Sequence, residues 1–303
     1  MQAYLQLMRI REWIKNLVVF AGPVLGFKLF DVASAWQAAA CFLTFCLMSS
    51  SSYAINDATD YQADALHPHK RTRPVARGAI QPVAATVFGL ALAALATGLG
   101  IVLLPLQATL LLAAYFVLIL GYSSGFKRRI ILDVIIIAVG FVLRAWAGAE
   151  AVGAETSPWL ISCTFTLCLF LGFGKRRCEL SAFSNAQQAG EHRATLARYT
   201  PELLNNLTSV SAGIAVVTFL LYTMDTPHRP PFPKEHLLYT LPLVVYGVFR
   251  YAFLVQSGRH TGPTEIFLKD RPLVGTILLW GLVAAGVVLE NHWIGWVAGA
   301  WPT

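Results

Sequence analysis

The chain has 303 residues, of which 56% are hydrophobic and only 13% are charged. A soluble protein of this length carries nearer a quarter charged residues. The composition therefore excludes an ordinary soluble enzyme and predicts an all-α, polytopic membrane protein. In such a protein the net charge of +7 reports on membrane topology and not on nucleic-acid binding.

Nine stretches are apolar enough and long enough to cross a bilayer as helices, which takes about 20 residues. Their approximate ranges are 14–30, 34–56, 82–104, 106–124, 131–151, 158–174, 203–224, 237–256 and 273–290. The first is the weakest, because Lys28 interrupts it, and Pro105 marks the turn between the third and the fourth. The proline-rich run 226–233 is predicted to be a loop. No linker divides the chain, so we expect a single transmembrane domain, one bundle of nine helices, over residues 1–303.

The basic residues predict how this bundle lies in the membrane. With a cytoplasmic N-terminus and alternating spans, 18 of the 23 lysines and arginines fall in inner segments and three in outer loops. Positive residues concentrate on the cytoplasmic side of membrane proteins. The sequence therefore predicts a cytoplasmic N-terminus, an external C-terminus and cytoplasmic charge clusters that converge on one pocket.

The most informative stretch begins at Asn56, at the end of the second span. Asp57, Asp60 and Asp64 are spaced by three and four residues, which places them on one face of a helix. Three neighbouring carboxylates repel one another and need a counter-cation, and hard oxygen ligands suit Mg²⁺. The alternative is a charged helix end that reaches into the lipid headgroups.

Cations follow the acids directly. Lys70, Arg71 and Arg73 come within nine residues of Asp64 and could hold phosphate oxygens. The histidines of this loop, His67 and His69, are expected to cap it and not to bind metal. An acidic face followed by a basic loop favours a site for a divalent cation and a polyphosphate.

A second polar segment joins the fourth and fifth spans. It offers the Tyr122 hydroxyl and the Lys127 cation, and it leads to Asp133 about one turn into the next helix. A deep acid usually has a partner. For Asp133 that partner is either a substrate or a salt bridge to Lys127 or Arg144. Arg144, three turns further along, is equally open to a structural and a functional role.

Two more basic groups stand at the ends of spans. Lys175 and Arg176 follow the sixth span, where they either set the topology or clamp phosphate. Lys15 precedes the first span, beside Trp13, as an interface anchor or a second group that reaches the same pocket.

The pattern Asn56-Asp57-x-x-Asp60-x-x-x-Asp64 resembles the first aspartate motif of the UbiA-type intramembrane prenyltransferase superfamily. The sequences Arg73-Pro74 and Arg11-x-Trp13-x-Lys15-Asn16 also look like that family. Its aromatic prenyltransferases carry a second aspartate-rich motif after the sixth helix, but the sequence GKRRCEL stands there in this chain, without an aspartate. The pattern is instead similar to the decaprenyl-phosphate phosphoribosyltransferase branch.

This resemblance implies a fold of nine helices and a Mg²⁺-dependent enzyme in a bacterial plasma membrane, with its active site on the cytoplasmic side. The donor would be phosphoribosyl pyrophosphate and the acceptor a polyprenyl phosphate, on the route to lipid-linked arabinose for cell-wall polysaccharide. The resemblance is compatible with a homo-oligomer. Two other functions compete, an aromatic or quinone-pathway prenyltransferase and a secondary transporter.

The candidate residues fall into two groups. The catalytic group is Asn56, Asp57, Asp60 and Asp64, of which the three aspartates are the expected metal ligands. The expected substrate-binding residues are Lys15, Lys70, Arg71, Arg73, Tyr122, Lys127, Asp133, Arg144, Lys175 and Arg176.

Overall fold

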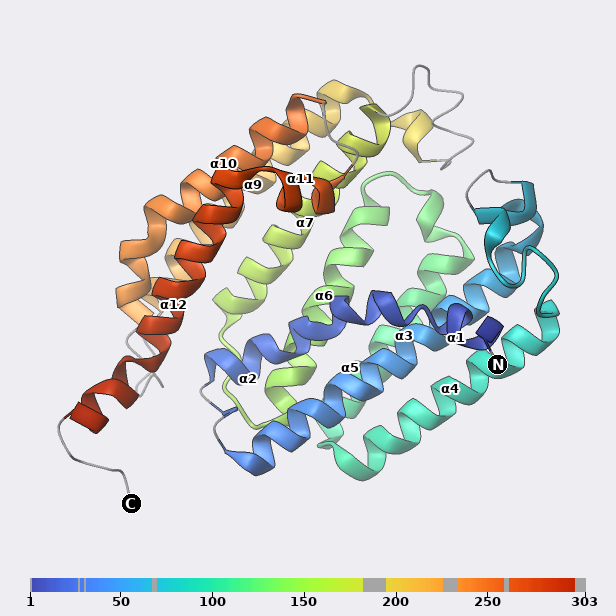
Figure 1. Cartoon of the computed structure of the whole chain (residues 1–303), viewed down its shortest axis with the longest axis horizontal. Helices are drawn as coiled ribbons and strands as arrows, with labels where there is room; N and C mark the ends of the chain where they lie inside the picture. The colour runs from blue at the N-terminus through green and yellow to red at the C-terminus, as the bar shows by residue number, and fades with distance from the viewer. Residues whose placement is uncertain are drawn as a thin grey trace. The chain divides into compact units, whose positions relative to one another are not determined.

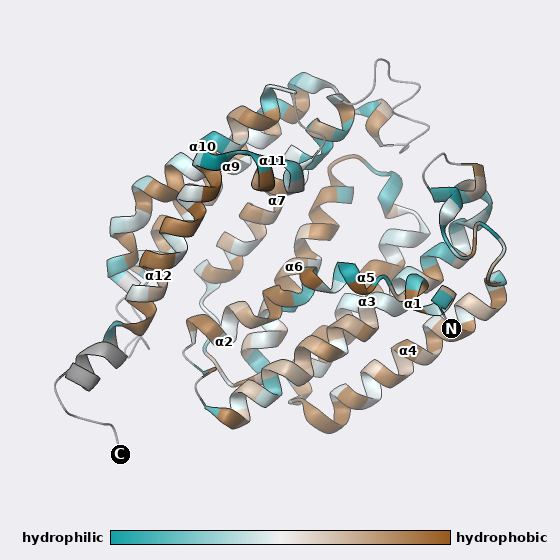
Figure 2. Ribbon diagram, viewed as in Figure 1, coloured by the Kyte–Doolittle hydropathy of each residue, from teal (hydrophilic) through white to brown (hydrophobic). Residues whose placement is uncertain are grey.

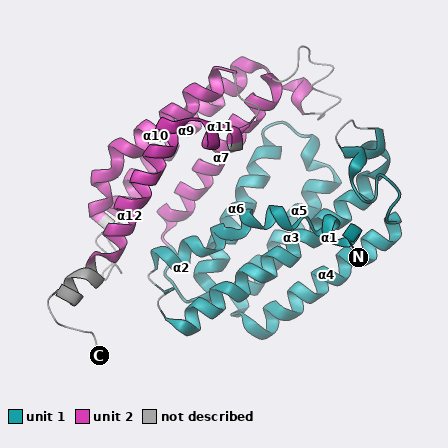
Figure 3. Ribbon diagram, viewed as in Figure 1, with its two compact units in different colours: residues 1–156 teal, residues 157–303 magenta. Residues whose placement is uncertain are grey.

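The computed structural model describes residues 2–26, 28–29, 31–66, 70–181, 195–225, 234–258 and 262–297. These residues form α-helices and 3₁₀ helices joined by turns, with no strand among them. The chain divides into two compact units, residues 1–156 and residues 157–303, which are described separately (Figure 3). The prediction of a single domain stays a prediction.

The first unit begins with a short helix and a 3₁₀ segment and continues with four long helices (Figure 1). Its elements are α1 (Gln2–Met8), η1 (Ile10–Phe20), α2 (Ala21–Leu25), α3 (Val32–Leu66), η2 (Lys70–Thr72), α4 (Pro82–Leu103), α5 (Leu106–Ser124), η3 (Phe126–Arg128) and α6 (Leu132–Ala151). The second unit contains α7 (Pro158–Ser181), η4 (Leu196–Arg198), α9 (Pro201–Met224), η5 (Lys234–Thr240), α10 (Leu241–Gln256), α11 (Pro263–Lys269) and α12 (Arg271–Val297).

Eight helices in the described part of the chain are long and apolar enough to cross a membrane. Figure 2 shows their predominantly hydrophobic residues, most clearly along α4. The polytopic, all-helical fold class is therefore confirmed, as is the turn at Pro105, which lies between the ends of α4 and α5. The predicted loop at 226–233 lies outside the described residues.

The first predicted span, 14–30, has an unexpected form, because η1 is a 3₁₀ helix and α2 is only five residues long. A 3₁₀ helix rises about 2.0 Å per residue, so the two elements together cover roughly 30 Å, the thickness of the hydrocarbon core. The segment starts beside Asp57 of α3 and ends where Gly22 packs against Ala149 of α6. A ninth crossing is not confirmed and remains a prediction.

The 3₁₀ geometry decides which side chains of η1 face the bundle. Residues three apart eclipse one another in such a helix. Trp13 accordingly donates to Ser50 Oγ of α3, while Asn16 and Val19 are buried. The backbone of Val19 lies so close to Gly148 that a Cβ there would meet the Val19 carbonyl oxygen at 1.8 Å. Only glycine fits at this crossing of η1 and α6.

Helix α3 continues well beyond residue 56, where the predicted membrane span ends, and includes the three acidic residues as their spacing predicted. Its 35 residues span roughly 52 Å at 1.5 Å per residue, which is longer than a bilayer core is thick. At its start Asp31 accepts hydrogen bonds from the Ser34 amide and hydroxyl, both at 2.8 Å, as an N-cap residue does. These bonds lower the pKa of the Asp31 carboxyl. At its other end the helix carries the acidic residues clear of the apolar span.

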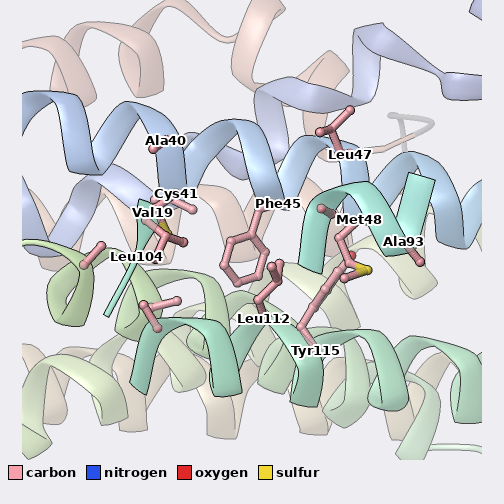
Figure 4. Close-up of a cluster of buried hydrophobic side chains, with 14 of the residues drawn as sticks. Val19, Ala40, Cys41, Phe45, Leu47, Met48, Ala93, Leu104, Leu112 and Tyr115 are labelled. Atoms are coloured by element: carbon pink, nitrogen blue, oxygen red, sulfur yellow. The ribbon is translucent and has the colours of Figure 1, made fainter. Parts of the chain in front are cut away.

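The core of the first unit lies between α3 and α5 (Figure 4). Phe45 and Met48 point from α3 toward Leu112 and Tyr115 of α5, and the rings of Phe45 and Tyr115 lie 5.4 Å apart. All four side chains are buried. This packing fixes α3 in rotation and so fixes the direction in which its acids point.

The second unit is built on the pairing of α7 with α9. The hydroxyls of Thr166 and Thr218 share a hydrogen bond of 3.0 Å across this pair. Near the end of α7, Gly174 leaves room for the buried ring of Tyr251 from α10, since a Cβ at Gly174 would lie 2.9 Å from that ring. The basic residues after Gly174 are therefore held on a packed helix and not on a loop.

Candidate active site

The three predicted acids lie on one continuous helix, as their spacing indicates. Asp57 is 2% exposed and Asp64 is 4% exposed, while Asp60 is half-buried and Asn56 lies beside them. Buried carboxylates require partners, because an isolated buried charge is costly. The partners here are cations from three different segments.

Two arginines neutralise Asp57 and Asp64. Arg9 donates through Nη2 to Asp57 Oδ1 at 2.5 Å, and its guanidinium also lies 4.8 Å from the centre of the Tyr53 ring. A single nitrogen of Arg73, Nη1, is 3.2 Å from Asp57 Oδ1 and 2.6 Å from Asp64 Oδ2. Arg73 thus bridges the two buried acids.

Two lysines also pair with the acidic residues of α3. Lys127 Nζ lies 2.5 Å from Asp60 Oδ2 and 3.4 Å from the Asn56 amide oxygen, so the loop after α5 reaches the acidic face of α3. Lys70 Nζ is 4.0 Å from Asp64 Oδ1. The structure therefore brings most of the predicted acids and cations together. Lys127, one of the two salt-bridge partners that the sequence offered for Asp133, pairs with Asp60.

Arg9 and Lys127 reach the acids from two segments outside the η2 loop, and each of these segments contains a strained backbone position. Among the described residues, Arg9 (φ 50°) and Ile131 (φ 67°) are the two non-glycine residues with positive φ. At Ile131 the Leu132 amide donates to the Ile130 carbonyl at 2.7 Å, which is a γ-turn of the rare positive-φ kind. Such strain costs about 1–3 kcal/mol and concentrates at functional sites. Here it adjoins the segments that hold Arg9 and Lys127 against α3.

The acidic face fits a divalent metal ion in its chemistry, although the metal ligands are not preassembled. Within the described residues, no three acidic, histidine or cysteine side chains form a ready-made cluster. Asp57 Oδ2, however, is a buried oxygen without a hydrogen-bond partner. A buried carboxylate oxygen left without a donor is suited to a metal ion. We identify Asp57 Oδ2, with Asp60 and Asp64, as the atoms that could hold one.

Arg144 belongs to a different cluster, deeper in the unit. It donates to Asn16 Oδ1 at 2.7 Å, to the Tyr115 hydroxyl at 2.6 Å and to the Gly140 carbonyl at 3.0 Å. Ser49 also donates to Asn16. These contacts tie α6 to η1, α3 and α5, which favours the structural of the two roles open for Arg144.

The other predicted residues of the first unit differ in how far they are buried. Asp133 is fully buried in the first turn of α6, and Tyr122 is half-buried near the end of α5. Arg71 is exposed, and Lys15 is exposed on η1 and paired with Glu12. His67 and His69 lie outside the described residues.

The second unit holds the other two predicted cations. Arg176 has a side chain only 3% exposed and contacts Glu179 Oε2 at 2.5 Å, whereas Lys175 is 53% exposed and 3.8 Å from the same carboxylate. Arg177 donates to Asn205 of α9 at 2.9 Å. Burial therefore separates two neighbours that look equivalent in the sequence.

Arg9 is not among the substrate-binding residues expected from the sequence, whereas Lys15 is. An α-helical reading gives no reason to prefer Arg9, but the 3₁₀ segment turns Trp13 and Asn16 toward the bundle and leaves Lys15 outside. No spacing in the sequence points to Arg9, because it precedes the 3₁₀ segment and adopts a left-handed backbone conformation.

Comparisons with known proteins agree with this architecture. The UbiA prenyltransferase family matches residues 17–269, which includes parts of both units. A protein of Corynebacterium glutamicum named decaprenyl-phosphate phosphoribosyltransferase is 31% identical over 279 residues, covering 90% of this chain and 82% of that protein. One of the same name from Mycolicibacterium smegmatis is 33% identical over 295 residues, covering 92% and 90%.

Among solved structures, a UbiA homolog from Archaeoglobus fulgidus bound to DMAPP and Mg²⁺ superposes with a TM-score of 0.71 at 22% identity. The match covers 95% of this chain and 99% of that one, and it bears on the fold alone. The predicted resemblance is thus confirmed by sequence over most of the chain, and the solved structure shares the fold over nearly all of it. This multi-pass membrane protein belongs to the UbiA prenyltransferase family.

Proposed function

We propose that this enzyme transfers the 5-phosphoribosyl group of phosphoribosyl pyrophosphate to a polyprenyl phosphate, with release of pyrophosphate. The observation that carries the proposal is the agreement between the named relatives and the residues at the end of α7. Relatives matched over most of their length carry the name of such an enzyme. The end of α7, in turn, presents Lys175 and Arg176 where aromatic prenyltransferases would have a second set of aspartates.

The acidic face of α3 would hold the metal, for which Mg²⁺ is the ion best suited to carboxylate oxygens and substrate phosphates. Asp57 would bind it through Oδ2, with Asp60 and Asp64. When bound, Mg²⁺ neutralises the charge that develops on the departing pyrophosphate.

The cations around the acids suit a donor with many phosphate oxygens. Phosphoribosyl pyrophosphate has a diphosphate and a separate 5-phosphate, and the acceptor brings one more phosphate. Lys70, Arg73 and Lys127 are close enough to the acids to contact a phosphate beside the metal, and Arg71, the exposed neighbour of Lys70 on η2, would join them. Charge-assisted contacts of this kind are the strong ones.

The reaction is a substitution at the anomeric carbon of the ribose. The bond from this carbon to the pyrophosphate oxygen breaks, and a bond to an acceptor phosphate oxygen forms. The acceptor phosphate is already anionic at neutral pH, so no general base is needed. As the leaving group departs, the anomeric carbon becomes oxocarbenium-like, and the role of the chain is to position the two phosphates and stabilise their charge.

The membrane provides the route for the acceptor. A polyprenyl phosphate can reach the ends of the helices from within the bilayer, while the water-soluble donor enters from the aqueous side. We place that side in the cytoplasm of a bacterial cell, in line with the distribution of basic residues. The lipid product would serve the synthesis of a lipid-linked arabinose donor.

Mass spectrometry of the lipids made by the purified protein tests this function. The protein is offered phosphoribosyl pyrophosphate with a polyprenyl phosphate and, separately, a prenyl diphosphate with 4-hydroxybenzoate. The first pair should yield a phosphoribosylated lipid that requires Mg²⁺ and is lost in EDTA and in Asp57→Asn. The matched control is Asp31→Asn, since asparagine also caps helices well and Asp31 lies at the far end of α3.

Two results would contradict the proposal. A product from the prenyl diphosphate with 4-hydroxybenzoate, and none from phosphoribosyl pyrophosphate with the polyprenyl phosphate, would make the chain an aromatic prenyltransferase. No lipid product from either pair, together with movement of a solute across proteoliposomes, would favour the transporter.

A further inference from the structure

The position of Arg73 between two buried acids has a consequence for metal binding. Its Nη1 atom is within 3.2 Å of an oxygen of Asp57 and within 2.6 Å of an oxygen of Asp64. Two carboxylates that hold one cationic group could also hold a metal ion. An ion held by Asp57 Oδ2 and Asp64 would therefore compete with Arg73 for the Asp64 carboxylate and would lie beside its guanidinium at Asp57.

The negative charges of these acids are already fully compensated. Asp57 and Asp64 supply two negative charges, Arg9 and Arg73 supply two positive ones, and Lys70 adds a third positive charge 4.0 Å from Asp64. A divalent cation that entered without displacing either arginine would face two guanidinium groups within a few ångströms, at a large electrostatic cost. Metal binding at this site consequently requires one of the arginines to move.

Arg73 is better placed to move than Arg9. Arg9 contacts one carboxylate and lies against the Tyr53 ring. It directly precedes η1, which is held to α3 by the hydrogen bond from Trp13 to Ser50. The two arginine side chains are equally exposed, at 25%, so the contacts around Arg9 and not its exposure make it the less mobile of the two. Arg73 lies in the turns between α3 and α4, outside any long helix.

We propose that Arg73 is an exchangeable counter-cation, which occupies the Asp57–Asp64 pair in the metal-free protein and leaves it when a divalent metal binds. This inference rests on the metal site of the proposed function and extends it. Once displaced, the guanidinium is free to contact a phosphate of the donor, which offers it new anionic oxygens. The exchange couples metal binding to donor binding, because each makes the other more favourable.

Mn²⁺ binding to the purified full-length protein without donor, followed by electron paramagnetic resonance, tests the exchange. Arg73→Gln should bind Mn²⁺ roughly tenfold more tightly than wild type, equivalent to about 1.4 kcal/mol. Arg73→Lys keeps the charge and should stay close to wild type. The matched control is Arg77→Gln, which removes the same charge nearby from a residue that contacts Gln6.

The outcomes separate the exchange from the metal site itself. If Asp57→Asn binds Mn²⁺ as wild type does, the proposed metal site is wrong. If Asp57→Asn loses Mn²⁺ but Arg73→Gln binds it no more tightly than wild type or Arg77→Gln, the metal site stands and the exchange is wrong. An equal gain in Arg73→Gln and Arg77→Gln would reduce the effect to net charge and would also overturn the exchange.

A measurement on the wild-type protein avoids the question of whether a variant folds. Phenylglyoxal modifies accessible arginines, and mass spectrometry of the resulting peptides reports each one separately. Addition of Mg²⁺ should increase the labelling rate of Arg73 several-fold and leave that of Arg77 unchanged, since only Arg73 is released from carboxylates. Unchanged labelling of Arg73 at saturating Mg²⁺ would refute the exchange.

Discussion

Arg9 Nη2 lies 2.5 Å from Asp57 Oδ1, so the start of η1 is tied to the acidic face of α3 across 48 residues of sequence. This contact determines which oxygen of Asp57 remains without a partner. Oδ1 accepts from Arg9 and Arg73, and Oδ2 is left buried and unbonded. The arrangement orients the carboxylate before any ligand arrives.

Replacing Arg9 by glutamine should therefore affect both stability and turnover. A hydrogen bond to a charged group contributes about 1.5–3 kcal/mol, and its loss would leave Asp57 with Arg73 as its cation. We expect the free energy of unfolding in SDS to fall by an amount in this range and turnover to fall with it. Arg11→Gln, an exposed arginine of the same segment, is the control. Equal behaviour of the two variants would contradict this role for Arg9.

The sequence predicted those features of the fold that depend on residues close together in the chain. The spacing of Asp57, Asp60 and Asp64 placed them correctly on one helix, and Pro105 placed the turn between two spans. The contacts of Arg9 were not predictable in this way, because they depend on a 3₁₀ segment whose period of three no hydrophobic pattern announced. The bond between Asn16 and Arg144 joins residues 128 apart, and only the assembled bundle brings them together.

The cluster around Arg144 should respond as a structural element. Tyr115→Phe removes the hydroxyl that accepts from Arg144 at 2.6 Å and leaves a buried guanidinium with one acceptor fewer. We expect a loss of about 1.5–3 kcal/mol in the free energy of unfolding, with KM for the donor unchanged. Tyr61→Phe is the control, since its hydroxyl contacts the exposed Gln62 and surface changes usually stay within about 0.5 kcal/mol.

A raised KM with unchanged stability in Tyr115→Phe would instead assign the cluster to substrate binding. That result would restore the second role that the sequence left open for Arg144.

The orientation of the chain is open to a direct test. In a background without the five native cysteines, Ala79→Cys and Glu155→Cys introduce thiols at exposed positions before α4 and after α6. The excess of basic residues predicts that an impermeant thiol reagent labels position 79 only from the cytoplasmic side and position 155 only from outside. Labelling in the reverse pattern would move the acidic face to the outer surface and remove its access to a cytoplasmic donor.

Lys175 and Arg176 offer the last test, because burial gives two adjacent cations different expected roles. Lys175 is 53% exposed, and a charge-assisted contact to a donor phosphate would contribute about 1.5–3 kcal/mol. Lys175→Ala should accordingly weaken equilibrium binding of phosphoribosyl pyrophosphate about 10- to 150-fold and leave stability nearly unchanged. Arg176→Ala should mainly lower the free energy of unfolding, since it leaves the carboxylate of Glu179 without its 2.5 Å contact in a buried setting.

Lys269→Ala is the matched control for Lys175. Lys269 is also an exposed lysine, 69% accessible, that pairs with a glutamate four residues away on its helix. If all three variants bind the donor equally well, the basic end of α7 serves membrane topology alone. If Lys175→Ala and Lys269→Ala weaken binding to the same extent, the effect is one of net charge, and the specific contact of Lys175 with the donor is refuted.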